Sequence, residues 1–167
     1  MPIEKFNKSI EDAKIISTII RRCQMELMTD LYKKGHCKEF CDFMTPEMII
    51  KKTKDRNIFI YKKEKKKNNN EIIGCIGFKT INQPTPNTGE VKLFFVNPDY
   101  HRQGIATKLF NHIQNIAKEM KLTKLRVFSS LYADKFYEKM GFISKGKVIR
   151  KNNEISPWTD IYMEKEI

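Results

Sequence analysis

A stretch from Val91 to Leu109 carries the residues whose types and spacing could do chemistry. It begins as an apolar strand, breaks at a tight turn around Pro98, and continues as a helix whose first turn carries Gly104 and Ala106. The first N–H groups of a helix have no partner within it and lie at the positive end of its dipole, so they bind phosphate well. Small residues there let a pyrophosphate approach the backbone.

This segment is neither a P-loop nor a dinucleotide fingerprint, because neither Gly-x4-Gly-Lys-Ser/Thr nor Gly-x-Gly-x-x-Gly occurs. On residue types alone, two interpretations stay open. The segment binds a phosphate-bearing ligand, or it is a plain strand, turn and helix in which glycine sits at a crowded contact.

Two sequence elements together resemble the GCN5-related N-acetyltransferases (GNAT). The acetyl-CoA motif of that family reads Arg/Gln-x-x-Gly-x-Gly/Ala, and His101-Arg102-Gln103-Gly104-Ile105-Ala106 matches it after a strand and turn. A later family element reads F-Y-E-K-x-G-F after a triplet that ends in Ala, and the residues from Ser130 to Phe142 match it. The spacing between these elements and the order of predicted helices and strands are also similar to the family.

The resemblance implies an acetyl-CoA site. Backbone N–H groups from Arg102 to Thr107 would hold the pyrophosphate, a strand would pair with the pantetheine arm, and the later element would lie against the other side of that arm. The implied contacts are His101, Arg102, Gln103, Gly104, Ile105, Ala106 and Thr107, then Phe94, Phe95 and Val96, then Ser130 and Ala133. The N–H of Val96 would face the thioester oxygen and stabilise an oxyanion.

Two positions depart from the family pattern. His101 stands where Arg or Gln is usual, and Ser130 stands where Asn is common. Both side chains can hydrogen-bond, so we expect altered cofactor contacts rather than lost binding.

The resemblance also implies two catalytic residues. Tyr137 occupies the position of the family's general acid, with Tyr132 as a weaker alternative, and Glu90 starts the strand that enters the site, where a carboxylate can serve as general base. The alternatives are a buried Tyr137 ring that only packs and a solvent-facing Glu90. His101, beside the pyrophosphate, is expected to contact the cofactor rather than act as base.

The sequence does not name the amine acceptor. In the family it is chosen by segments that correspond roughly to residues 20–56 and 145–160. Those segments carry apolar and aromatic residues that could line a pocket or belong to the core: Met25, Met28, Tyr32, Phe40, Phe43, Met44 and Trp158.

Hydrophobic periodicity predicts the elements that position these residues. We expect strands over 1–6, 57–63, 71–81, 90–96, 124–129, 142–150 and 158–166. We expect helices from Ser9 to about Gly35, from Thr45 to about Asp55, over 104–121 and over 131–140. The predicted fold is α/β (α+β): one GNAT domain over residues 1–167, with a mixed central sheet of about seven strands and helices on both faces.

Composition bounds the function classes. The chain has 167 residues, 32 of them Lys or Arg against 20 acidic residues, for a net charge of +12. Most basic residues are Lys, whereas base and phosphate recognition favours Arg, which argues against a nucleic-acid partner. The excess is concentrated between Lys51 and Lys67, and the Lys/Asn-rich run over 62–70 reads as a solvated loop or a polyanion contact.

No targeting or metal-binding pattern is expected. No apolar run approaches a membrane span, and the first residues do not form a signal peptide, so a cytoplasmic protein is expected. His36-Cys37-x3-Cys41 loosely resembles a metal half-site but has no second half, so no metal is predicted. Cys23, Cys37, Cys41 and Cys75 are expected to be buried thiols.

The resulting hypothesis is direct acetyl transfer from acetyl-CoA to an amine in a ternary complex. No cysteine lies in either motif, which argues against an acyl-enzyme. Transfer of another acyl group, a catalytically silent acyl-CoA sensor of the same fold, and a basic nucleic-acid-binding module are the rivals. A homodimer through the last strands is compatible with the family.

Overall fold

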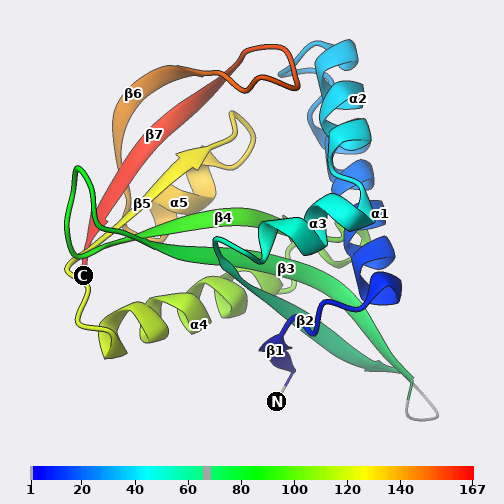
Figure 1. Cartoon of the computed structure of the whole chain (residues 1–167), viewed down its shortest axis with the longest axis horizontal. Helices are drawn as coiled ribbons and strands as arrows, with labels where there is room; N and C mark the ends of the chain where they lie inside the picture. Colours follow the sequence, from blue (N-terminus) through cyan, green and yellow to red (C-terminus); the bar gives the residue numbers. More distant parts are fainter. Residues whose placement is uncertain (1, 66–68) are drawn as a thin grey trace.

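The computed structural model describes residues 2–65 and 69–167 (Figure 1). The strands are β1 (Ile3–Lys5), β2 (Asn57–Lys65), β3 (Asn69–Ile81), β4 (Thr88–Val96), β5 (Lys124–Ser129), β6 (Ile143–Arg150) and β7 (Trp158–Glu166). The helices are α1 (Ile10–Leu27), α2 (Lys34–Phe43), α3 (Pro46–Lys52), α4 (Ile105–Glu119) and α5 (Asp134–Lys139), with a short 3-10 turn, η1, at Pro98–Tyr100. Of the Lys/Asn-rich run over 62–70, interpreted as a solvated loop or a polyanion contact, residues 62–65 continue β2 and residues 69–70 begin β3, so the loop prediction was wrong for them. Residues 66–68 lie outside the described residues.

The seven strands form one mixed sheet in the order β1-β2-β3-β4-β5-β7-β6. All neighbours are antiparallel except β4 and β5, which run parallel. That parallel pairing covers only Thr88–Val91 of β4 against Lys124–Val127 of β5, although both strands continue beyond it. Past this point β5 and β7 diverge from β4, and the sheet opens in the middle (Figure 1).

Helices cover both faces of the sheet, as predicted (Figure 1). Along β2, Ile58 and Ile60 pack with α1 and α3, whereas the alternating Phe59 and Tyr61 pack with α4 on the opposite face. This period of two is that of a strand buried on both sides. The α4 face continues under β5 and β7 and includes α5.

Capping residues set two helix starts where the sequence predicts them. Ser9 Oγ accepts a hydrogen bond from Asp12 N–H (3.1 Å) ahead of α1, and Thr45 Oγ1 accepts one from Met48 N–H (3.1 Å) ahead of α3. Each side chain satisfies one of the N–H groups that a helix start leaves open.

The prediction of one helix from Ser9 to about Gly35 was wrong. α1 ends at Leu27, a turn follows, and Gly35 lies inside a separate helix, α2. Cys37 and Cys41 of α2 are buried four residues apart, which is the spacing of one helix face. In the described part of the chain, no helix is long and apolar enough to cross a membrane.

Candidate active site

The opening between β4 and β5 is bordered by two groups of the predicted cofactor residues. Phe94, Phe95 and Val96 lie on β4 after its pairing with β5 has ended. Across the opening, β5 ends at Ser129, and residues 130–133 form the turn into α5. Because parallel strands end at the same edge of a sheet, the ends of these two strands face each other. An extended ligand placed there would contact both segments.

A bulge shapes the β4 side of this opening. The register between β3 and β4 shifts between Cys75 and Gly77, and Leu93 has a positive φ of 46°. A Cβ on Gly77 would lie 2.9 Å from the Lys92 carbonyl oxygen, so glycine is needed where β3 closely approaches the bulged strand. The bulge leaves Phe94 packed toward α5 and Phe95 toward α1 and α3.

The backbone of Val96 is directed into the opening. Asn97 N–H donates to the Ile73 carbonyl (2.8 Å), and Val96 lies opposite Gly74 in the same register. Hydrogen-bonded and non-bonded pairs alternate along antiparallel strands. The N–H of Val96 therefore points away from β3, toward the side on which β5 has separated.

A rigid turn connects Val96 to α4. His101 Nε2 lies 2.8 Å from the Val96 carbonyl oxygen and donates to it, and Asn97 Oδ1 accepts from Asp99 N–H (3.0 Å). Arg22 of α1 donates to Asn97 (2.9 Å) and to Asp99 (2.8 Å) and so ties α1 to this turn. Sequence reasoning missed Arg22, because its partners lie more than seventy residues away.

The N-terminus of α4 has the form of an anion cradle. Arg102 and Gly104 have positive φ angles of 59° and 78°, and backbone of this kind turns successive N–H groups toward one concavity. Gly104 is the N-cap and has no side chain to bond the free N–H groups of α4. A Cβ added to Gly104 would meet no atom within 4 Å, so the space in front of the backbone is open. These features fit a pyrophosphate.

Tyr137, on α5, is packed in the core against Phe94 of β4. Its side chain is only 4 % exposed, and its ring packs edge-on against Phe94, Phe136 and Phe142 with centroid distances of 6.3, 5.5 and 5.3 Å. The hydroxyl makes no hydrogen bond to the described residues. Burial raises the pKa of Tyr137, and the charge of Asp160 raises it further. The ring is therefore buried, as the alternative of a packing role for Tyr137 predicts. Because its pKa is raised, the hydroxyl is protonated at neutral pH and can act as a proton donor.

A match to a known family model decides the family. The model of the Acetyltransferase (GNAT) family matches residues 23–142 of the chain. The chain belongs to the GNAT acetyltransferase family.

Solved structures show the same fold at low sequence identity. A GCN5-related N-acetyltransferase from Rhodopseudomonas palustris is 16% identical, with a TM-score of 0.80 over 99% of this chain and 94% of that one. PaiA N-acetyltransferase from Thermoplasma acidophilum, solved with coenzyme A, is 18% identical, with a TM-score of 0.69 over the whole of both chains. An acetyltransferase from Bacillus anthracis, solved with acetyl coenzyme A, is 23% identical, with a TM-score of 0.54 over 68% of this chain and 63% of that one. No curated protein matches in sequence.

In this GNAT domain Glu90 does not face solvent. Glu90 is buried, with 1 % of the residue exposed. Its carboxylate accepts a hydrogen bond from Arg126 (2.6 Å) and forms an ion pair with Lys92. Burial alone would raise the pKa of Glu90, but the hydrogen bonds and charges of Lys92 and Arg126 outweigh it and leave this pKa below its usual range. A carboxylate held by two cations is a weak proton acceptor.

We expect Glu90→Gln to lower the free energy of unfolding by about 3 kcal/mol at neutral pH, because it leaves two partly buried cations without their anion. The folded pKa of Glu90 is lowered, so its stabilisation is complete above the unfolded pKa and is lost as pH falls through the folded one. The difference between the variant and the parent should therefore shrink in acid. Urea unfolding across pH measures it.

The matched control is Glu138→Gln, which removes an exposed carboxylate paired with Lys135 on α5. Exposed pairs contribute little, so this variant should unfold like the parent. Equal stabilities for Glu90→Gln and Glu138→Gln would contradict a structural role for the buried ion pairs.

A second buried carboxylate, Asp160 on β7, was missed by sequence reasoning. Asp160 is 8 % exposed and accepts hydrogen bonds from Tyr32 Oη (3.2 Å) and Trp158 Nε1 (2.9 Å). Burial raises its pKa, although these two donors act in the opposite direction. The sequence held no signal for it, because an aspartate two residues after Trp158 reads equally well as a solvent-facing strand position.

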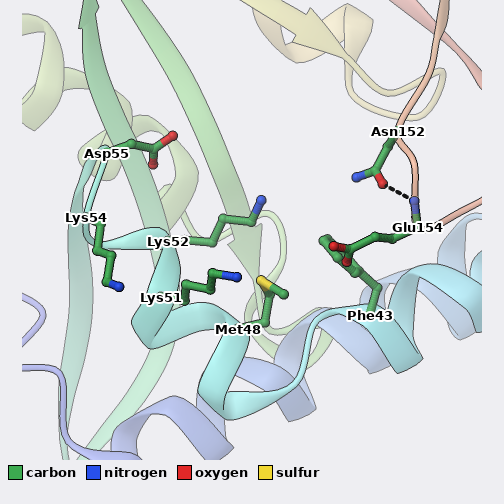
Figure 2. Close-up of a pocket in the computed structure, with 8 residues that line it drawn as sticks. All are labelled: Phe43, Met48, Lys51, Lys52, Lys54, Asp55, Asn152 and Glu154. Carbon is green, nitrogen blue, oxygen red and sulfur yellow. Dashed lines mark hydrogen bonds between the residues drawn. The ribbon is translucent and has the colours of Figure 1, made fainter.

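Two pockets flank the loop between β6 and β7. The α2–β7 pocket, about 570 Å³, lies beside the active-site opening and is lined by Leu31, Tyr32, His36, Leu131, Pro157 and Trp158 among others. The other pocket, about 340 Å³, lies between the α3 region and that loop. Its lining includes Lys51, Lys52 and Lys54, and the side chains of Lys51 and Lys52 extend toward Asn152 and Glu154 (Figure 2). None of the predicted cofactor or catalytic residues lines this lysine-rich pocket.

Proposed function

We propose that the protein transfers the acetyl group of acetyl-CoA to a primary amine of a small molecule or peptide, by direct transfer in a ternary complex. The observation that carries this proposal is the opening between β4 and β5, which leads from the bulge at Leu93 to the open N-terminus of α4 at Gly104. A binding path of this shape suits an extended chain that ends in a pyrophosphate.

The proposed cofactor contacts follow this path. The pyrophosphate lies against the N–H groups of Arg102 to Thr107, and His101 holds the turn through the Val96 carbonyl. The pantetheine arm pairs with Phe94 to Val96, and Ser130 and Ala133 lie on its other side. The N–H of Val96 then faces the thioester oxygen, where a preformed donor stabilises developing negative charge.

Direct transfer is supported by the state of the cysteines. All four are free and buried. Burial raises the pKa of all four thiols, to about 12 for Cys23 and Cys75, so at neutral pH none of them provides the thiolate that an acyl-enzyme needs. The amine therefore attacks the thioester itself.

Two proton transfers complete the reaction. The Tyr137 hydroxyl gives its proton to the leaving sulfur, and a carboxylate takes the proton that the amine nitrogen loses. Glu90 is the candidate for the base that the sequence provides. The structure adds Asp160 as a second carboxylate near the opening.

The test is free-thiol release from acetyl-CoA with a panel of polyamines, amino acids, amino sugars, aminoglycosides, arylamines and peptides. We expect release with one acceptor class. A rise in melting temperature on adding acetyl-CoA, without release by any amine, would support the silent acyl-CoA sensor instead. Absence of both signals would contradict the acetyl-CoA site.

A further inference from the structure

We propose that Asp160 takes the acceptor's proton, and that the acceptor is a cationic primary amine on a flat apolar body, seated in the α2–β7 pocket. This inference rests on the proposed function. In this proposal the general base is Asp160 rather than Glu90, and Asp160 lies outside both family motifs.

The position of Asp160 in the sheet places it beside the end of β5, at the opening. Ser129 pairs with Ile161 at the end of β5, so Asp160 lies one residue beyond the last β5 partner, where Ser130 begins the turn into α5. The side chain alternates with Ile161, which packs against the α4 face, and so it lies on the opposite face of the sheet.

A hydrogen-bond network fixes the carboxylate. Tyr32 Oη accepts from the Leu131 N–H (2.9 Å) and donates to one Asp160 oxygen (3.2 Å). Trp158 Nε1 donates to the other oxygen (2.9 Å). Each oxygen of a carboxylate has two lone pairs, so each keeps one for an amine N–H.

The α2–β7 pocket supplies the body of the acceptor site. Tyr32 and Trp158 line it while their polar ends bond Asp160. His36 lies between their rings, with centroid distances of 5.8 Å to Tyr32 and 5.7 Å to Trp158. Aromatic faces attract cations, and burial lowers the pKa of His36, so its ring adds no repelling charge at neutral pH.

Other charged and titratable groups also influence Asp160. Arg150 of β6 and Lys92 of β4 favour the ionised carboxylate, as do its bonds to Trp158 and Tyr32, whereas burial opposes it. The charge of Asp160 also raises the pKa of Tyr137 on α5. Glu90 has two cations bonded to it, whereas Asp160 is bonded to neutral donors and is therefore the better proton acceptor.

The proton count balances. The ammonium first loses one proton to solvent, and the neutral nitrogen forms a bond to the acetyl carbon as the C–S bond breaks and its electron pair leaves with sulfur. The proton lost by nitrogen goes to Asp160, and sulfur takes the Tyr137 proton. Asp160 then gives its proton to solvent and the Tyr137 oxyanion takes one from solvent, which restores both residues.

The experiment compares Asp160→Asn with the parent, using 2-phenylethylamine as acceptor and 2-phenylethanol as its uncharged control. We expect kcat/KM for the amine to fall about 10²- to 10⁴-fold and the acidic limb of the pH profile to disappear. The thermal shift caused by acetyl-CoA should stay unchanged, which shows that the variant is folded.

Tyr32→Phe separates a proton-transfer role from a structural one. It removes a donor that lowers the pKa of Asp160, so the acidic limb should move to higher pH, which a merely structural loss would not produce. A parent-like profile in Asp160→Asn, or loss of the limb in Glu90→Gln instead, would overturn the proposal.

If the parent enzyme releases no thiol with 2-phenylethylamine, the proposed function is refuted for this amine. The binding of the amine to the parent and to Asp160→Asn then tests the role of Asp160 separately. With acetyl-CoA present, 2-phenylethylamine should raise the melting temperature of the parent but not of Asp160→Asn, and 2-phenylethanol should raise neither. Equal shifts by the amine in both proteins would overturn the role of Asp160.

Discussion

Replacing Gly104 with leucine should abolish acetyl-CoA binding while leaving the protein folded. At its φ of 78° a side chain costs about 1–2 kcal/mol, which a domain of this size tolerates. The leucine side chain would occupy the open space in front of the α4 N-terminus, where the pyrophosphate is expected. Isothermal titration with acetyl-CoA should show at least a 100-fold rise in Kd.

Gly146→Leu is the matched control for this variant. Gly146 also has a positive φ, of 106°, and open space around its Cβ, but it lies in β6. Both variants should lose similar stability, and only Gly104→Leu should lose the cofactor. Undiminished binding by folded Gly104→Leu would refute the pyrophosphate position, and an equal loss in both variants would attribute the effect to backbone strain.

Local patterns were sufficient for most of the fold. β5 and β7 begin and end where hydrophobic alternation predicts them, and Ser9 and Thr45 start their helices as caps. These features depend on neighbours within a few residues, so the sequence carries them directly. The family motifs placed one ligand between the strand at Phe94 and the turn at Ser130, and both of these segments border the opening of the sheet.

Features that depend on distant contacts could not be predicted in this way. Gly35 was read as a helix end, although α2 continues through it with Cys37 and Cys41 buried in the α1 side of the core. The ion pairs of Glu90 involve Arg126, on a strand adjacent in the sheet but remote in the sequence. Its environment therefore became visible only once the strand order was known.

Asp160 shows the same limit more sharply. Its partner Tyr32 is 128 residues away in the chain, in the turn between α1 and α2. Tyr32 and Trp158 were both predicted as residues that could line a pocket, and both line the α2–β7 pocket. Their shared carboxylate was not identified, because an aspartate two residues after a tryptophan reads equally well as a solvent-facing strand position.

Tyr137→Phe should lower kcat about 100-fold or more and leave the Kd for acetyl-CoA unchanged. The variant removes only an oxygen, and in the described part of the chain that hydroxyl has no hydrogen-bond partner, so packing and stability should be retained. A positioned general acid contributes about 10²- to 10⁴-fold, because the thiolate would otherwise leave unprotonated. Single-turnover thiol release with the amine found by the panel measures the chemical step.

The pH dependence distinguishes this role from simple packing. A general acid must be protonated, and burial together with Asp160 raises the pKa of Tyr137 above the usual value of about 10. The parent rate should therefore not fall as pH rises to that value, and Tyr137→Phe should be slower throughout this range. Tyr132→Phe, which changes the exposed alternative beside the same turn, should behave like the parent. If Tyr132→Phe lost activity and Tyr137→Phe kept it, the acid would be Tyr132, and the Tyr137 ring would serve only to pack Phe94 and Phe142 against α5.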